Sequence, residues 1–186
     1  MFGSIQSHFK SLFEACASWL LEDTIKIKGR WTYEAWNPDG SLAWRETIDN
    51  MTTLAGLDNI IGVQLAGTTQ VTTWYAGLID NAGYTGIAAA DTSGTHSGWV
   101  ESSAYTESVR QTWTPGAVSG QSVTNPTAMS FSINATVTIK GGFLISNNTK
   151  GGTTGTLFAT GLFGSAQALV SGQSLKVTYT CSATGS

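Results

Sequence analysis

The chain has 186 residues, which suits one domain, and its 41% hydrophobic and 10% aromatic residues supply material for a core. Charged residues make up only 11%, against about 25% in an average soluble domain. The aromatic content argues against a disordered chain. Nine thinly spread Lys and Arg residues argue against a nucleic-acid partner, because nucleic-acid binders present clustered basic side chains.

The charges are distributed unevenly along the chain. Residues 46–109 contain seven acidic residues and no Lys or Arg, whereas residues 110–186 contain four basic residues and no Asp or Glu. One interpretation is that an acidic surface of one subunit meets a basic surface of its neighbour, with Asp80, Asp91, Lys140 and Lys150 as candidate interface residues. The alternative is that the two segments interleave in one fold and cancel locally.

The N-terminus lacks the basic region and uninterrupted apolar run of a secretory signal, and no stretch approaches the roughly 18 apolar residues that span a bilayer. We therefore expect synthesis and retention in a cytoplasm, with no membrane partner. Cys16 and Cys181 match no metal-binding spacing. We expect two buried or half-buried thiols, with a disulfide between them as the alternative.

Residues 1–23 are predicted to form a helical arm, with an amphipathic helix over residues 4–22. Its apolar stripe consists of Ile5, Phe9, Leu12, Phe13, Cys16, Trp19 and Leu20. The stripe either covers this domain's own sheet or docks on a neighbouring subunit or larger partner, and in the second case Phe9, Phe13 and Trp19 are candidate contacts. Membrane-surface binding is disfavoured because the polar face is not basic.

Residues 24–186 are predicted to form a single β-sandwich domain. Apolar residues alternate from Ile25 to Ala35 and again from Leu42 to Ile48, and the turn sequence Asn37-Pro38-Asp39-Gly40 between them predicts a hairpin. Three tryptophans of this hairpin are expected to pack across the strands rather than to form a ligand platform. They are Trp31, Trp36 and Trp44.

A short internal helix is predicted over residues 50–65, with Asn50 or Thr52 as its N-cap. Residues 71–79 follow as a strand that ends in a turn at residues 80–83. Within this strand we expect Trp74 and Leu78 to face the core, with Tyr75 and Ile79 on the opposite face. Residues 88–98 are predicted to form an irregular loop, because their small side chains bury little apolar area.

The rest of the chain is predicted to form short strands near residues 109–113, 122–123, 129–139, 142–146, 156–160 and 175–179. A one-residue slip in the alternation at Ala135 predicts a bulge within residues 129–139. Many short strands separated by turn residues indicate an antiparallel β-sandwich or barrel, and the fold class is therefore mostly β.

Motifs for catalysis are absent from the sequence. It has no nucleophile elbow, zinc-protease helix, phosphate-binding loop or dinucleotide fingerprint, and His8 and His96 are its only histidines. Asp91, His96 and Ser97 lie close in sequence, but a catalytic triad is defined by its spatial geometry. A glycosidase needs only two carboxylates at the right separation. A pair among the acidic residues between positions 46 and 107 therefore stays open as an alternative catalytic site. We expect a non-enzymatic protein with no cofactor, metal or catalytic residue.

Several segments together carry a family resemblance. They are WTYEAW (31–36), PDGSLAWRE (38–46), NMTTLAGL (50–57), WYAGLID (74–80), ADT (90–92), HSGW (96–99), YTESVR (105–110), FSINAT (131–136) and KGGTTGTL (150–157). As an ordered set over about residues 31–180 they resemble a family of tailed-bacteriophage virion proteins. Its better understood members are capsid cement or decoration proteins.

This resemblance implies a jelly-roll-like sandwich on the outer surface of the phage head. The implied partners are the major capsid protein and further copies of the chain, as a homodimer or homotrimer. It supplies no catalytic residue and does not extend to residues 4–22. One rival is a tail, neck or fibre protein that contacts host glycan through Trp36, Trp74 or Trp99. Another is a carbohydrate-binding sandwich outside any virion, which requires at least two exposed coplanar aromatic rings.

Overall fold

The computed structural model describes residues 24–185, so the predicted helix over residues 4–22, with Phe9, Phe13 and Trp19, lies outside the described part. The described chain begins with a hairpin of β1 (Ile25–Trp36) and β2 (Leu42–Thr52), followed by the helix α2 (Leu54–Leu65). The remaining strands are β3 (Trp74–Asp80), β4 (Gln111–Trp113), β5 (Ser122–Thr124), β6 (Met129–Ser132), β7 (Val137–Ile145), β8 (Leu157–Leu169) and β9 (Ser174–Gly185).

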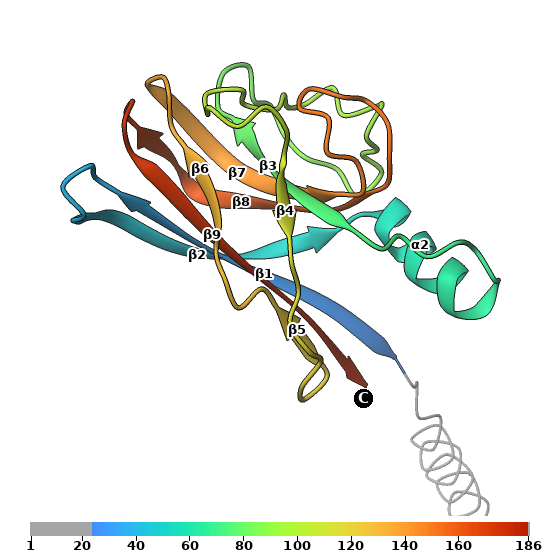
Figure 1. Ribbon diagram of the computed structural model, residues 1–186. Helices are drawn as coiled ribbons and strands as arrows, with labels where there is room; N and C mark the ends of the chain where they lie inside the picture. Colours follow the sequence, from blue (N-terminus) through green and yellow to red (C-terminus); the bar gives the residue numbers. More distant parts are fainter. Residues whose placement is uncertain (1–23, 186) are drawn as a thin grey trace, which may run out of the picture.

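These strands form one antiparallel sheet in the order β4-β3-β7-β8-β2-β1-β9-β5, with β6 also pairing with β9. The sheet curls on itself, so that the β1 and β9 layer faces the β3, β7 and β8 layer (Figure 1). The end of β2 joins the two layers, because Asn50–Thr52 pair with β8. The predicted mostly β, antiparallel, sandwich-like fold is confirmed.

The hairpin forms as its alternating pattern predicts. Trp31, Tyr33 and Ala35 are all 0% exposed and point into the sandwich, while the intervening residues face outward. Gly40 adopts φ +81°, and its N–H donates to the Asn37 carbonyl oxygen at 2.9 Å, which closes the predicted turn. Because only glycine reaches this backbone region without strain, the turn defines the register of the hairpin.

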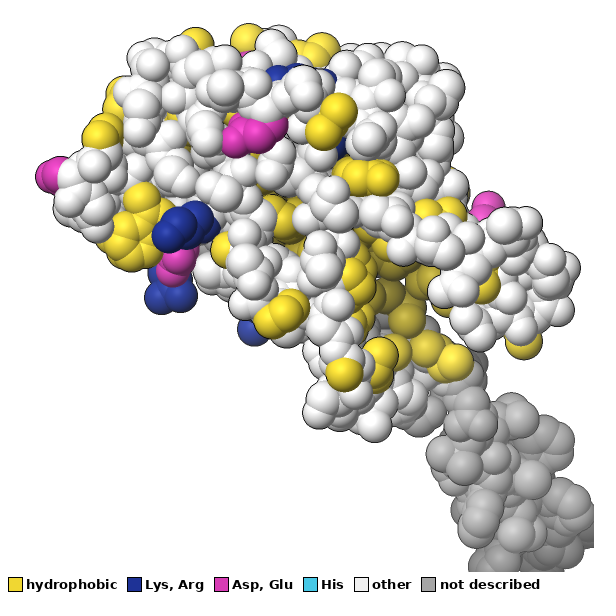
Figure 2. Space-filling model, in the orientation of Figure 1, with side chains coloured by type: hydrophobic (Ala, Val, Ile, Leu, Met, Phe, Trp, Pro, Cys, Tyr) yellow, Lys and Arg dark blue, Asp and Glu magenta, His cyan; other side chains and the backbone are white. Residues whose placement is uncertain are grey.

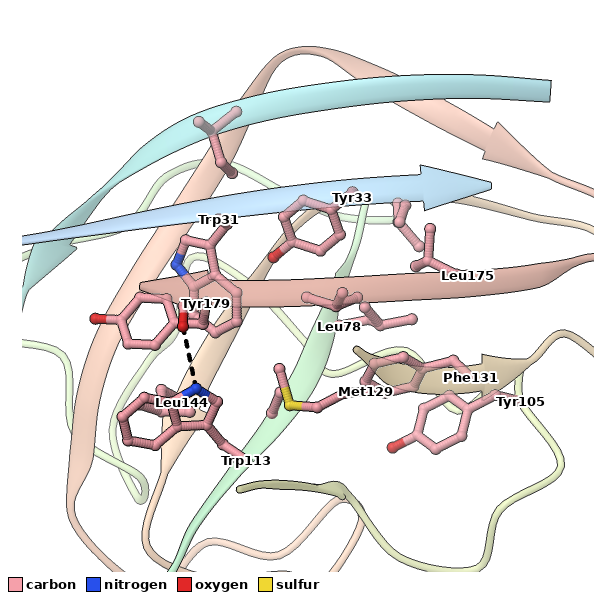
Figure 3. Packing of buried hydrophobic residues seen from close by; sticks show 14 of the residues in the cluster. Trp31, Tyr33, Leu78, Tyr105, Trp113, Met129, Phe131, Leu144, Leu175 and Tyr179 are labelled. Carbon is pink, nitrogen blue, oxygen red and sulfur yellow. Dashed lines mark hydrogen bonds between the residues drawn. The ribbon is translucent and has the colours of Figure 1, made fainter. Parts of the chain in front are cut away.

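Aromatic side chains dominate the core between the two layers (Figure 3). The Trp31 and Tyr179 ring centroids lie 4.2 Å apart, and the Trp113 Nε1–H donates to the Tyr179 carbonyl oxygen at 3.1 Å. Trp44 packs edge-on against Phe163, with the ring centroids 5.9 Å apart. Trp31 and Trp44 therefore serve packing, as the sequence predicts.

A second, smaller apolar cluster lies on the other face of β3 and β7. It contains Ile79, Trp99, Phe143, Ile145 and Leu157. Loop residues between β3 and β4 contribute to it through Trp99. Strand β3 is thus covered on both faces: Trp74 and Leu78 face the main core, and Tyr75 and Ile79 face the second cluster. This confirms the predicted division of the four side chains.

The internal helix begins later than predicted. Residues 50–52 continue β2, because Asn50, Met51 and Thr52 pair with Gly161, Thr160 and Ala159 of β8. The N-cap is therefore Thr53, whose side chain accepts a hydrogen bond from the Gly56 N–H at 3.0 Å. Both predicted caps, Asn50 and Thr52, were wrong because strand pairing takes these residues.

The predicted bulge at Ala135 was also wrong. Strand β6 pairs with β9, whereas β7 pairs with β3 and β8, so residues 133–136 carry the chain from one layer to the other. The Ile133 N–H donates to the Gln173 carbonyl oxygen at 2.9 Å in this crossing segment. Strand β8 runs well beyond the predicted residues 156–160. Its Gly161 lies under the Trp31 ring, where a larger side chain would collide with the indole.

Candidate interaction surface

The helix α2 exposes an apolar stripe on the surface of the molecule. We define the α2 stripe as Leu54, Leu57, Ile61 and Leu65, which are 53%, 40%, 58% and 80% exposed. Their spacing of three and four residues places them on one side of the helix. Figure 1 shows that α2 lies beside the sandwich rather than within it. Full burial of one such side chain contributes about 1.5–3 kcal/mol, so the stripe is a strong candidate contact for another protein surface.

The first turn of α2 is attached firmly to the sandwich. The Thr53 hydroxyl donates to the Leu157 carbonyl oxygen, and the Thr53 N–H donates to the Phe158 carbonyl oxygen at 3.0 Å. The Leu54 N–H donates to the Ala89 carbonyl oxygen at 2.8 Å. Gly56 is buried directly against the Phe158 carbonyl group. These contacts hold the helix in place while its stripe faces solvent.

The other side of α2 anchors it to the core. Ile60 packs against the main apolar cluster. At the far end, the Ala66 and Thr68 N–H groups both donate to the Gly62 carbonyl oxygen at 3.0 Å, and Gly67 takes φ +68°. The helix is thus attached to the sandwich through its first turn and Ile60, and a local cap closes its far end, so the stripe is preformed for binding.

A layer of loops covers the second apolar cluster, and it contains Asp91, His96 and Ser97. The Asp91 carboxylate accepts hydrogen bonds from the Ala88 N–H and the Trp99 Nε1–H, both at 2.9 Å. His96 stacks on Trp99 with 3.9 Å between the ring centroids, and its Nδ1 lies 3.0 Å from the Trp99 carbonyl oxygen. Asp91 and His96 therefore hold Trp99 in place rather than forming a catalytic triad with Ser97.

A cavity of about 240 Å³ lies beneath this loop layer. Two charged residues line it, Arg110 and Glu101, whose side chains are only 3% and 6% exposed. They form a bidentate ion pair, with Nε to Oε1 at 3.0 Å and Nη2 to Oε2 at 2.8 Å. Sequence reasoning missed this pair, although Arg110 is the first basic residue after the acid-only segment and Glu101 lies nine positions before it.

The remaining polar atoms of the pair are also bonded within the chain. Arg110 Nη1 donates to the Asn147 carbonyl oxygen at 2.9 Å, and Nη2 donates to the Gly152 carbonyl oxygen at 3.0 Å. The Gly151 N–H donates to Glu101 Oε2 at 2.6 Å. The pair therefore ties the loop after β7 to the loop before β4, and it leaves no free charge for a ligand.

The four charged residues predicted at an interface also make contacts inside their own chain. Asp80 accepts from the Ala82 N–H at 2.8 Å, and Asp91 bonds Trp99 as described. Lys140 Nζ donates to the Phe163 carbonyl oxygen at 2.8 Å, and Lys150 Nζ donates to the Tyr105 carbonyl oxygen at 2.9 Å. Within residues 24–185, no ion pair joins any two of these four side chains. Glu101 belongs to the acidic segment and Arg110 to the basic segment. Their buried ion pair therefore shows that the two segments interleave within one fold at this site.

Of the three aromatic residues suggested for glycan contact, Trp99 is buried and Trp36 and Trp74 are half-buried. Trp99 is 3% exposed, Trp74 packs on Phe158 with ring centroids 5.1 Å apart, and Lys176 lies 5.0 Å from the Trp36 ring centroid. Among the described residues, the exposed large hydrophobic side chains are all aliphatic. This arrangement disfavours a sugar-binding platform.

Residues 24–185 contain no group of three or more His, Cys, Asp or Glu side chains arranged to hold a metal ion. No helix in the same range has the length and apolar character needed to cross a membrane.

Comparison with known proteins does not supply a family. No protein-family model matches the sequence, and no curated protein matches it.

Proposed function

We propose that this chain is a non-enzymatic bacteriophage virion protein that binds the outer head shell over joints between major capsid protein subunits and stabilises the shell. The observation that carries the proposal is the α2 stripe, because four exposed aliphatic side chains on a firmly attached helix suit a protein surface. The ordered segments that resemble capsid cement proteins support the same assignment. The engagement of the charged cavity residues with their own chain favours a structural function over chemistry on a small molecule.

In this proposal the chain acts by mass action. It binds the assembled shell more tightly than free capsid subunits, so each bound copy lowers the free energy of the assembled state. Association of the chain with itself, as a homodimer or homotrimer, links several weak contacts and raises the overall affinity without a new contact. Synthesis in the host cytoplasm places the protein where heads assemble.

The test uses heads assembled without this protein and the purified full chain. We expect the wild type to cosediment with the heads and to raise the temperature at which they release DNA. The variant Leu57→Glu/Ile61→Glu places two charges on the stripe, so its affinity should fall by at least about 100-fold. Val170→Glu is the matched control, since Val170 is 48% exposed away from the stripe, and it should bind like the wild type.

Wild-type protein that fails to bind heads would contradict the proposal. A tail, neck or fibre position is the second candidate, and separated heads and tails distinguish the two. Binding to tails alone, with the same loss in the Leu57→Glu/Ile61→Glu variant, would assign the stripe to a tail partner instead.

A further inference from the structure

The outer face of the layer formed by β1, β2 and β9 carries most of the positive charge of the described chain. Outward positions alternate with inward ones on these strands, and they hold five of the eight basic residues within residues 24–185. The five are Lys26, Lys28, Arg30, Arg45 and Lys176. Only two acidic residues of these three strands, Glu34 and Asp49, point to the same side, so the face has a net charge of +3. Basic side chains gather beneath the hairpin of β1 and β2, at the lower left of Figure 2.

The two acids of this face are already engaged. Asp49 Oδ1 lies 3.0 Å from Arg30 Nε, and Glu34 Oε1 lies 3.0 Å from Arg45 Nη2. Each acid therefore balances the charge of one arginine. The excess positive charge of the face resides on its lysines.

Lys26 and Lys28 carry uncompensated charge at the beginning of β1. Both side chains are exposed, and within residues 24–185 neither forms an ion pair or a hydrogen bond. We define the basic row as Lys26, Lys28 and Arg30. Because alternate residues of a strand point to the same face, the three side chains stand about 6.6 Å apart in a line. Like charges at this spacing repel one another, so a partner that places acids beside the row relieves the repulsion.

A groove of about 280 Å³ lies along the basic row. Besides the Gly29 backbone, it is lined by Lys28, Arg30, Asp49, Thr180 and Ser182. Ser182 lies directly across the ladder from Lys28, and Thr180 from Arg30, so each cation has a hydroxyl group beside it. The Ser182 hydroxyl lies 3.5 Å from the Lys28 carbonyl oxygen, at the limit for a hydrogen bond, and it can turn to donate to a bound carboxylate instead. Cations and hydroxyl donors side by side suit the binding of carboxylates.

The spacing of the basic row favours a polypeptide partner over nucleic acid. Acidic residues at i and i+2 of a strand lie about 6.6 Å apart, and those at i and i+4 of a helix lie about 6 Å apart along its axis, so either element can match two neighbouring members of the row. Duplex DNA carries one charge per about 1.7 Å of its axis, and the proteins that bind it present clustered cations. In the basic row only Lys26 and Lys28 are unpaired, and the nearby Asp49 carboxylate repels phosphate.

We propose that the basic row is a docking surface for an acidic segment of another protein, whose carboxylates bind Lys26 and Lys28 and enter the groove beside Arg30. The amines of Lys140 and Lys150, by contrast, donate to carbonyl oxygens of their own chain. The basic surface for a neighbour therefore lies on β1 rather than at these two residues. The proposal does not depend on the proposed capsid function.

Fluorescence anisotropy of the full chain with a labelled acidic peptide tests the proposal. The probe has about ten residues with Glu and Thr in alternation, which places its carboxylates about 6.6 Å apart in an extended conformation. We expect binding at low ionic strength. The affinity should weaken at least about tenfold between about 20 mM and 300 mM salt, because salt screens exposed charges. The same peptide with Gln in place of Glu should not bind.

Two variants separate the basic row from the net charge of the chain. Lys26→Gln/Lys28→Gln removes two unpaired charges from the row, and the affinity for the acidic peptide should fall about tenfold. Ser97→Glu/Ser103→Glu is the matched control, because it lowers the net charge by the same two units at two exposed serines between β3 and β4. This control should bind within about twofold of the wild type.

Four outcomes would overturn the proposal. One is a wild type that does not bind the acidic peptide at low ionic strength. The second is a Lys26→Gln/Lys28→Gln variant that binds like the wild type, and the third is an equal loss in both variants, which would reduce the effect to net charge. The fourth is tighter binding of a labelled thymidine oligonucleotide of the same charge, which would assign the row to nucleic acid. Binding to phage heads is a separate measurement, because Leu57→Glu/Ile61→Glu leaves the basic row intact.

Discussion

Arg110 and Glu101 form a bidentate ion pair whose side chains are almost completely buried beneath the loop layer. Removal of one partner leaves the other charge without compensation in a site that excludes water. We therefore expect Arg110→Ala to lower the free energy of unfolding by about 3–5 kcal/mol, measured by urea denaturation.

The control for this prediction is an exposed pair of similar length. Arg30 Nε lies 3.0 Å from Asp49 Oδ1, but the two side chains are 66% and 76% exposed. Arg30→Ala should change the free energy of unfolding by less than about 1 kcal/mol, since solvent screens the pair. Equal effects of the two substitutions would mean that burial does not govern the energetics of the Arg110–Glu101 pair.

Gly56 allows α2 to lie directly on β8. A methyl group at this position would overlap the Phe158 carbonyl oxygen, which belongs to the backbone and cannot rotate away. Gly56→Ala should therefore destabilise the protein by about 1–3 kcal/mol, although alanine is the better helix former.

Gly62 is the control for Gly56, because it lies in the same helix. A methyl group there would meet only the Thr68 side chain, which can rotate. Gly62→Ala should be neutral or should stabilise by up to about 1 kcal/mol. Thermal unfolding of both variants measures the difference, and a Gly56→Ala variant as stable as Gly62→Ala would refute the close packing.

Asn125 joins three parts of the fold through one buried amide. Its Oδ1 accepts from the Tyr179 N–H at 2.7 Å and from the Trp113 Nε1–H at 3.2 Å, and its Nδ2 donates to the Thr127 and Val177 carbonyl oxygens. Asn125→Ala removes the partner of the Tyr179 N–H and of the Thr127 and Val177 carbonyl oxygens, so we expect a loss of about 1–3 kcal/mol in urea denaturation. Asn125→Asp keeps the acceptor but loses both donors, and it should also be destabilised. A fully stable Asn125→Ala would contradict this assignment.

Three buried phenols make the fold sensitive to alkali. Burial raises the pKa of the Tyr33, Tyr105 and Tyr179 side chains above the ordinary value. In the unfolded chain they release protons near pH 10, whereas in the folded chain they stay protonated, so unfolding is coupled to proton release. The stability from these groups is complete below about pH 10. Above that pH it falls by about 1.4 kcal/mol per pH unit for each phenol.

Urea denaturation between about pH 8 and pH 11 measures this dependence. Tyr105→Phe should reduce the slope above pH 10, since the variant removes one of the three buried phenols and keeps the shape of the ring. A stability that stays constant throughout this range would contradict the prediction.

The strands that were predictable are those whose own residues alternate. In β1 the buried Trp31, Tyr33 and Ala35 alternate with less buried residues, so period two reports the buried face directly. The continuation of β8 beyond residue 160 was not predictable, because it begins at Gly161, whose small size is required by the Trp31 ring across the core. At residues 133–136 the chain passes from one layer to the other. This passage depends on the pairing of β6 with β9 and of β7 with β3 and β8, and local periodicity carries no information about such pairing.

The interaction surface was harder to predict than the fold. The sequence correctly predicted a helix within residues 50–65, but its pattern does not tell which side of that helix the sheet covers. The Arg110–Glu101 pair is held by the loop after β7, through Asn147, Gly151 and Gly152, which lies about 40 residues further along the chain. Both features therefore required the three-dimensional structure.

The two strands that end the sheet, β4 and β5, contain three residues each. A short edge offers few unpaired backbone groups to a strand from another molecule. A chain with only 11% charged residues has little electrostatic repulsion to keep its copies apart. These short edge strands therefore protect the protein against fibril growth by strand addition. Many copies can then lie close together without polymerising through their sheets.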